Sequence, residues 1–304
     1  MNRISPDNQL GPEQPGTIIS HYSTEVAVED LHGQLFRCYF RQSCDHLVVG
    51  DHVKWQLDKG DRGVVTGIAP RKGVLSRHGK DGHEQVMAAN VDCLVTMFSA
   101  EEALSTLSVD RYLVAAELSN IKAVLVVNKI DLATEEQRDQ LESIFDLYAS
   151  LGYSVHFVSV SKEKGMRALK REFDDKCSII VGQSGVGKSS LINTLLPHES
   201  IRVGEVSSGN RQGKHTTTGA HLYHIPSGGD LIDSAGIRHF NCWHTTSDEI
   251  ERGFIEFAPY FGLCKFRNCQ HAKEPGCALQ AAVKDGKISP ERLSNYHTMV
   301  AELT

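Results

Sequence analysis

The chain has 304 residues, of which 40% are hydrophobic and 23% charged, a composition typical of a soluble globular protein with two or three domains. Its formal net charge of −6 argues against a protein that coats nucleic acid by bulk electrostatics, although a local basic face is compatible with it. No stretch comes near the ~18 consecutive apolar residues that cross a bilayer, and the N-terminus lacks the pattern of a secretory signal. We therefore expect a cytoplasmic protein.

The first third of the chain predicts a tail followed by a small β domain. Prolines and glycines crowd residues 1–16, which we expect to be a disordered tail. Residues 17–95 contain short β segments separated by turn residues, among them GQLFRCYF, LVVGDHVKWQL and GVVTGIA. Five such strands would form an OB-fold barrel, although an SH3-like barrel gives the same pattern. Four basic residues form a weak nucleic-acid signal here: Arg71, Lys72, Arg77 and Lys80.

Residues 96–245 predict an α/β domain. Short apolar runs of the kind found in buried parallel strands occur at 123–127, 154–159, 178–181 and 222–225. Helical patterns lie between them, and one has apolar residues at helical spacing from Leu141 to Leu151, followed by Gly152 as a C′ cap. Alternation of strands and helices indicates a parallel sheet covered by helices. From residue 246 to 304 the pattern is mainly helical, with a cluster of cysteines.

A phosphate-binding loop follows the strand at 178–181. The segment Gly182-x4-Gly187-Lys188-Ser189 matches the Walker A pattern, and it lies between a predicted strand and a predicted helix. The glycines let backbone N–H groups cradle phosphate oxygens, and the helix adds its positive N-terminus. Lys188 is expected to reach the β- and γ-phosphates, and the Ser189 hydroxyl is expected to bind Mg²⁺. The chain is therefore predicted to bind a nucleoside triphosphate.

The base is predicted to be guanine. Asn128-Lys129-x-Asp131 follows the strand at 123–127, and an N-K-x-D element beside a phosphate loop reads guanine in GTPases. The Asp carboxylate accepts from the N1 and N2 protons of guanine, the Lys stem covers the base, and the Asn braces the loop. Adenine lacks that pair of donors, which disfavours ATP. Ser159, at the end of the next strand, lies in a loop suited to the guanine O6.

Two segments after the phosphate loop resemble nucleotide switches. GKHTTT offers Thr216, Thr217 and Thr218, and we take Thr217 as the residue that completes Mg²⁺ coordination. LIDSAG ends a strand with Asp233-x-x-Gly236, in which the Asp holds the Mg²⁺ water shell and the Gly N–H meets the γ-phosphate. Ordinary Ras-like proteins carry N-K-x-D after the phosphate loop and switches. Here it comes first, so we expect a circularly permuted GTPase in which the second switch directly precedes the C-terminal segment.

The C-terminal segment carries a metal-binding pattern. Cys264-x4-Cys269-x-His271-x5-Cys277 supplies four soft ligands, a set that binds structural Zn²⁺ tetrahedrally and leaves no open catalytic position. Basic and aromatic residues interleave with these ligands and suit RNA, although they are equally compatible with an ordinary solvated surface: Lys265, Phe266, Arg267 and Lys273. The other five cysteines are scattered, and we expect them to be reduced thiols.

These motifs in this order resemble the RsgA (YjeQ) family of GTPases that depend on the small ribosomal subunit. The resemblance spans about residues 20–304 and rests on GQSGVGKSSLIN, GKHTTT, IDSAGIRHF, NKIDL and CKFRNCQHAKEPGC. It implies an N-terminal OB-fold, a permuted GTPase domain and a C-terminal zinc domain. It also implies GTP with Mg²⁺ as substrate, 16S rRNA of the small (30S) subunit as partner in late subunit maturation, and a monomer. The expected GTP contacts are Asn128, Lys129, Asp131, Ser159, Gly182, Gln183, Ser184, Gly185, Val186, Gly187, Lys188, Ser189 and Ser190.

Hydrolysis is expected to be slow without the ribosome. Ras-type enzymes orient the attacking water with a Gln after the second switch motif, and here that position is Ile237. Candidates for the missing group are His215, His239 and His244, or a group supplied by RNA or a ribosomal protein. Position 235 is Ala where the family usually has Pro, which is expected to loosen that switch.

Three other functions are compatible with parts of the pattern. A P-loop ATPase or kinase would share the phosphate loop, but the N-K-x-D element opposes it. A zinc-containing RNA-binding protein could hold GTP as a static ligand, which single-turnover hydrolysis would distinguish from a switch. A signalling GTPase unrelated to the ribosome is the third, and the two flanking modules with nucleic-acid character argue against it.

Overall fold

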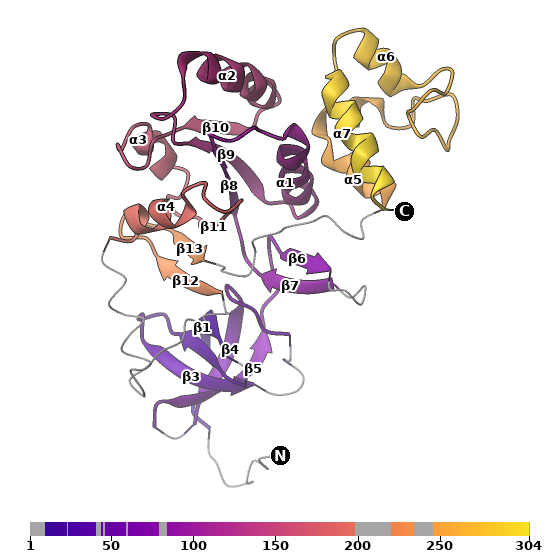
Figure 1. Ribbon diagram of the computed structural model, residues 1–304. Helices are drawn as coiled ribbons and strands as arrows, with labels where there is room; N and C mark the ends of the chain where they lie inside the picture. The colour runs from indigo at the N-terminus through magenta and orange to yellow at the C-terminus, as the bar shows by residue number, and fades with distance from the viewer. Residues whose placement is uncertain are drawn as a thin grey trace.

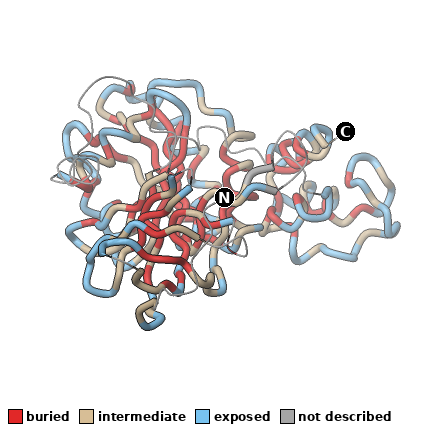
Figure 2. Tube along the Cα trace, turned by 90° about the horizontal axis from the view of Figure 1, so that it is seen from below, coloured by how far each residue is buried: buried red, intermediate tan, exposed pale blue. Residues whose placement is uncertain are grey.

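The computed structural model describes residues 10–22, 24–40, 44, 46–58, 60–78, 84–197, 220–233 and 246–303. Within these ranges the chain forms a small barrel, a central sheet covered by helices, and a group of C-terminal helices (Figure 1). Buried residues run along the strands and the inner helix faces, and the turns are exposed (Figure 2). None of the described helices is both long enough and apolar enough to cross a membrane.

The barrel consists of β1 (Gln14–His21), β2 (Val26–Glu29), β3 (Leu35–Phe40), β4 (His52–Leu57) and β5 (Arg62–Ile68). The strands pair in the order β1-β2-β3-β5-β4, with β3 and β5 parallel, and pairing of β1 with β4 closes the barrel. Its interior is packed around Trp55, which is fully buried. This strand order and the closure confirm the prediction of a five-stranded OB-type barrel. Closure also removes the unpaired edges that an open sheet would expose.

The predicted disordered tail is too long at its C-terminal end. Strand β1 begins at Gln14, and the indole of Trp55 donates to the Pro15 carbonyl at 3.2 Å. A Cβ on Gly16 would lie 2.5 Å from Val28 Cγ1, so this glycine is required by the close approach of neighbouring strands. The Pro and Gly residues taken as a sign of disorder therefore serve the barrel at 14–16, while residues 1–9 lie outside the described part.

A hairpin of β6 (Leu75–His78) and β7 (Glu84–Ala88) leads to the central sheet, whose strands pair in the order β10-β9-β8-β11-β13-β12. Their bounds are β8 Cys93–Ser99, β9 Lys122–Asn128, β10 Ser154–Phe157, β11 Cys177–Gly182, β12 His221–His224 and β13 Asp230–Asp233. Strands β8 to β11 and β13 are parallel, but β12 is antiparallel to β13. The run at 222–225 was therefore wrongly expected to be a parallel strand; it returns through a tight turn at Gly228 and Gly229.

Helices cover both faces of this sheet. Their bounds are α1 Thr106–Leu118, α2 Glu135–Ser150, α3 Met166–Lys170 and α4 Lys188–Leu195. Helix α2 begins at Thr134, which forms a capping box with Gln137, and Gly152 follows its end at φ +99°. One apolar core lies on the face of α1 and α2, and a second on the face of α3 and α4. The helices thereby hold the carboxyl ends of the parallel strands at one edge, where ligands of such sheets bind.

The barrel and the central sheet are continuous. Strand β1 pairs with β12 at Ser20 and His221, so the two form one sheet. The side chain of His224 on β12 adds a second link, since its Nε2 lies 2.6 Å from Glu29 of β2 and its Nδ1 lies 2.6 Å from Asp230. These carboxylates raise the pKa of His224 to about 10, so the imidazole is charged at neutral pH.

The C-terminal helices pack against α1 (Figure 1). They are α5 Ser247–Gly253, the 3₁₀ helix η3 Ile255–Tyr260, α6 Ala278–Lys284 and α7 Pro290–Ala301. Buried Arg292 of α7 links this group to the sheet domain, because it contacts Asp110 of α1 at 2.6 Å and Glu256 of η3 at 2.6 Å. Asp110 also accepts from Tyr148 of α2 and Asn295 of α7. The C-terminal helices are thus fixed to α1 and α2 by a buried polar network.

Candidate functional site

The phosphate loop connects β11 to α4 at the carboxyl edge of the sheet. Gly182, Gly185 and Gly187 have φ values of +143°, +88° and +101°, a region that L side chains rarely adopt. A Cβ on Gly182 would lie 2.3 Å from the Met97 carbonyl oxygen, so this position excludes any larger residue. The sequence folds into a loop here because these glycines permit turns that bring backbone N–H groups inward, and α4 begins immediately after them.

Lys188, at the start of α4, and Asp233, at the end of β13, carry opposite charges next to this loop. The Lys188 ammonium donates to the Gly182 carbonyl at 2.8 Å and also to the Gln183 carbonyl. Burial raises the pKa of the Asp233 carboxyl, and the positive charge of Lys188 opposes that rise. Ser189 and Ser190 are exposed in the first turn of α4, next to the loop. A cation and a carboxylate therefore flank the loop, an arrangement that matches the charges of a triphosphate and a divalent metal.

The base loop is joined directly to the phosphate loop by Asn128. This side chain is 3% exposed; its Nδ2 donates to the Val186 carbonyl at 2.9 Å, and its Oδ1 accepts from the Val160 amide at 3.1 Å. A Cβ on Gly187 would lie 2.2 Å from Asn128 Nδ2, so the glycine makes room for the bridge. One buried amide thereby fixes three loops relative to one another: those after β9, β10 and β11.

Asp131 has the acceptor that the sequence predicts for guanine. Its Oδ1 is buried and lacks a hydrogen-bond partner within the described residues. The Ser159 hydroxyl lowers the pKa of the Asp131 carboxyl, so the side chain is ionised at neutral pH. A buried acceptor without a partner carries a desolvation cost that a ligand with N–H donors would relieve. The residues present therefore fit a guanine base.

Lys129, which follows Asn128, has a left-handed backbone at φ +63°. Its ammonium lies 2.6 Å from Glu101, a residue in the turn after β8. Sequence reasoning missed Glu101, because nothing in the motif indicates which neighbouring strand supplies a partner for the lysine.

The predicted switch residues are not placed by the structure. Thr216, Thr217, Thr218 and His215 of the first switch lie outside the described residues. So do Ala235, Gly236, Ile237, His239 and His244 of the second. Asp233 alone represents the second switch, at the end of β13. The remaining predicted contacts to the base and phosphates gather at the carboxyl ends of β9, β10 and β11.

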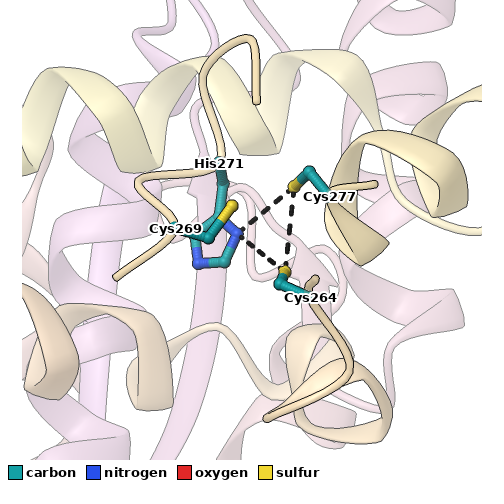
Figure 3. Close-up of side chains that lie close together, drawn as sticks. All are labelled: Cys264, Cys269, His271 and Cys277. Atoms are coloured by element: carbon teal, nitrogen blue, oxygen red, sulfur yellow. Dashed lines mark hydrogen bonds between the residues drawn. The ribbon is translucent and has the colours of Figure 1, made fainter. Parts of the chain in front are cut away.

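The four predicted zinc ligands lie together (Figure 3). Their ligand atoms are all within 4.8 Å of one another. His271 Nδ1 is 3.5 Å from Cys264 Sγ and 3.4 Å from Cys277 Sγ, and those two sulfurs are 4.0 Å apart. Tetrahedral zinc with ordinary bond lengths requires S–S separations of about 3.8 Å and N–S separations of about 3.5 Å. The donor set and its spacing therefore fit one Zn²⁺ with four protein ligands.

Further groups orient these ligands. Glu251 of α5 lies 3.5 Å from His271 Nε2, and it raises the pKa of that imidazole to about 9. A carboxylate on the outer nitrogen leaves Nδ1 facing the metal position, which is the usual arrangement for a metal-binding histidine. Gln280 of α6 donates to the His271 carbonyl at 2.7 Å and holds the loop. Sequence reasoning missed Glu251, because it lies on α5, twenty positions before His271, and the helix η3 comes between them.

The surface of this metal loop is basic and partly apolar. Lys265, Arg267 and Lys273 are exposed, and the Lys265 ammonium lies 5.6 Å from the centre of the Phe266 ring, which is 42% exposed. The same interleaved side chains that the sequence shows are therefore accessible to a partner.

Comparisons with known proteins agree with this geometry. The family model described as "RsgA GTPase" matches residues 68–243. The chain is 46% identical to the "Small ribosomal subunit biogenesis GTPase RsgA" of Marinobacter nauticus over 97% of this chain and 86% of that protein. It is also 46% identical to the protein of that name from Hahella chejuensis, over 95% of this chain and 84% of the relative.

Solved structures show the same architecture. The crystal structure of YjeQ from Thermotoga maritima matches with a TM-score of 0.78 at 29% identity, covering 96% of this chain and 99% of that chain. YloQ, described as a circularly permuted GTPase, matches with a TM-score of 0.75 at 27% identity, covering 99% and 98%. The permuted order inferred from the motifs is confirmed by these neighbours and by the strand order of the central sheet.

Proposed function

The chain belongs to the RsgA GTPase family, and from that premise we propose that it hydrolyses GTP as a factor in the biogenesis of the small ribosomal subunit. The GTP assignment rests on the hydrogen bonds of the Asn128 side chain, which join the phosphate loop to the loops after β9 and β10 at the expected base position. We further propose three domains, with the GTPase domain in the middle. The boundary expected between residues 95 and 96 falls inside β8 (Cys93–Ser99), a strand of the central sheet, and β1 of the barrel begins before residue 17, at Gln14.

In this proposal the two loops divide the recognition of GTP. Asp131 accepts from the guanine N1 and N2 protons with the acceptor that otherwise lacks a partner. The backbone of Gly182–Ser190 surrounds the phosphates, and Lys188 leaves the loop carbonyls to contact the β- and γ-phosphate oxygens. Ser189 and Thr217 would hold Mg²⁺, which would neutralise phosphate charge, and Asp233 would hold the water shell of that ion.

Slow intrinsic hydrolysis is part of the proposal. Ile237 stands where a water-orienting glutamine would be, so the group that orients water is His215, His239 or His244, or it is supplied by the ribosome. Stimulation by the small (30S) subunit then follows, because binding would complete or order the hydrolytic site.

The flanking modules are proposed to contact 16S rRNA. The zinc loop presents exposed Lys265, Arg267 and Lys273 with Phe266, a mixture suited to phosphates and unstacked bases. The Zn²⁺ is structural in this proposal, because Cys264, Cys269, His271 and Cys277 would leave no open position. We propose that the protein acts as a cytoplasmic monomer.

Nucleotide preference tests the base assignment. The purified protein should bind GTP and GDP with Mg²⁺ far more tightly than ATP and ADP. Asp131→Asn should lose about 10- to 100-fold in GTP affinity, because it removes charge-assisted hydrogen bonds to guanine. The same variant should gain affinity for XTP, whose O2 accepts from the new amide. Glu163→Gln, an exposed residue near the same loops, is the matched control. Equal affinity of the unmodified protein for GTP and ATP would contradict the assignment.

A second candidate function is a zinc-containing RNA-binding protein that holds GTP without turning it over. The exposed basic loop around the zinc ligands favours it as much as it favours a switch. Single-turnover hydrolysis distinguishes the two, because a static ligand would remain intact on the protein whether small subunits are present or absent.

A further inference from the structure

The turn after β8 brings an acidic side chain to the base site. Strands β8 and β9 are parallel and in register, with Ser99 opposite Asn128, and the Ala100 amide donates to the Asn128 carbonyl at 2.9 Å. The next residues of both strands therefore leave the sheet side by side. Glu101 follows one strand and Lys129 follows the other, and the Glu101 carboxylate lies 2.6 Å from the Lys129 ammonium.

The backbone on both sides of this ion pair is fixed by other contacts. Ser99 is 3% exposed, and its hydroxyl accepts from the Glu101 amide at 3.3 Å. Lys129 is held at φ +63°, and its carbonyl accepts from the Leu132 amide at 2.9 Å. The backbone does not determine the direction of the four-carbon side chain of Lys129, which is rich in rotamers. Glu101 removes part of that freedom.

We propose that Glu101 is a positioning residue of the guanine site, which holds the Lys129 ammonium so that the aliphatic stem lies over the base. The inference rests on the proposed function, in which Asn128, Lys129 and Asp131 read guanine. An ion pair between side chains that are 31% and 42% exposed contributes little to folding. Its consequence is therefore expected in nucleotide binding, where an ordered lysine stem meets the base without first losing entropy.

The same turn shows which part of the nucleotide the pair affects. Glu102 faces the phosphate loop, since its Oε1 lies 3.8 Å from the place where a Cβ on Gly185 would be. Glu101 instead faces the base loop, through Lys129. Removing the Glu101 charge should therefore weaken the binding of GDP and GTP by the same factor. A change beside the phosphates would instead affect the binding of the two nucleotides differently.

The test measures release of fluorescent GDP and of a non-hydrolysable GTP analogue from the full chain. Glu101→Gln keeps the shape and removes the charge, and it should speed release of both nucleotides about two- to fivefold in 0.1 M salt. The difference should shrink in 1 M salt, because exposed charges are screened. In a Lys129→Met background, Glu101→Gln should have no further effect. Glu142→Gln, exposed on α2, is the control and should match the unmodified protein.

Unchanged release in Glu101→Gln would overturn the inference, and so would an equal acceleration in the Lys129→Met background. An effect on GTP but not on GDP would also overturn it. A thermal unfolding midpoint of the variant equal to that of the unmodified protein shows that the variant is folded. If the unmodified protein binds no guanine nucleotide, the proposed function fails, and that outcome is distinct from a failure at Glu101 alone.

Discussion

Substitution of Arg292 probes the junction between the C-terminal helices and the sheet domain. The Arg292 side chain is 1% exposed, and its guanidinium contacts Asp110 at 2.6 Å and both carboxylate oxygens of Glu256 at 2.6 and 2.7 Å. Its guanidinium carbon also lies 4.5 Å from the centre of the Phe254 ring. Arg292→Met keeps much of the apolar stem and removes the charge, so two buried carboxylates lose their cation.

The loss of stability depends on which hydrogen bonds the two carboxylates keep. Removing one partner of a buried ion pair costs about 3–5 kcal/mol. Asp110 would keep its hydrogen bonds from Tyr148 and Asn295, and burial already raises the pKa of its carboxyl despite Arg292. It would therefore take up a proton rather than remain fully charged, which places the loss of stability at about 3 kcal/mol at pH 7.

This loss should diminish in acid. Without Arg292 the pKa of Asp110 rises further in the folded protein, while in the unfolded chain it returns to its ordinary value. Below the raised value the folded variant binds a proton that the unfolded chain does not, so acidification from pH 7 toward pH 5 narrows the deficit. The wild-type protein should change less over this range.

Hydrogen exchange of α1 and α7 measures the effect locally, because unfolding of several domains need not be two-state. A loss of about 3 kcal/mol corresponds to roughly hundredfold faster exchange in these helices. Arg167→Met, an exposed arginine on α3, is the control and should stay within about 0.5 kcal/mol of the unmodified protein. If exchange in Arg292→Met accelerates less than tenfold and no more than in the Arg167→Met control, the reasoning is refuted.

Two further outcomes follow from ion pairs elsewhere in the chain. His224→Gln should destabilise the link between barrel and sheet by about 1 kcal/mol after solvent screening. Asp230 and Glu29 raise the pKa of His224 to about 10, so this loss of stability should be complete below pH 6.5 and should disappear as the pH rises to 10. Thermal unfolding across that pH range would show the change. Glu251→Gln should weaken zinc binding about 10- to 100-fold by loosening His271, measured by competition with a chelator; unchanged affinity would mean that Glu251 does not orient the ligand.

The motifs that could be predicted from sequence are those in which neighbouring residues act together. The phosphate loop needs glycines at positive φ, and Gly182, Gly185 and Gly187 are all within six residues of one another. The predicted zinc ligands likewise lie within fourteen residues, so their spacing alone indicates that they meet. The barrel could be predicted as a class, because short strands with turn residues recur along 17–95.

What could not be predicted depends on contacts between distant residues. The sequence pattern does not single out strand β8, between β9 and β11, although it is buried along its whole length and leads into the turn in which Glu101 contacts Ser99 and Lys129. The pairing of β1 with β12 joins residues two hundred positions apart, and the Asp110–Arg292 contact joins α1 to α7 over a similar distance. Local periodicity carries no information about such partners.

Single-turnover GTP hydrolysis with and without purified small ribosomal subunits tests the proposed function most directly. The unmodified protein should hydrolyse GTP slowly alone and much faster with subunits, and Lys188→Ala should lose the stimulation because it lacks the cation that meets the phosphates. Glu142→Gln should behave as the unmodified protein. Tight GTP binding with equally slow hydrolysis in the presence and absence of subunits would contradict a ribosome-stimulated GTPase.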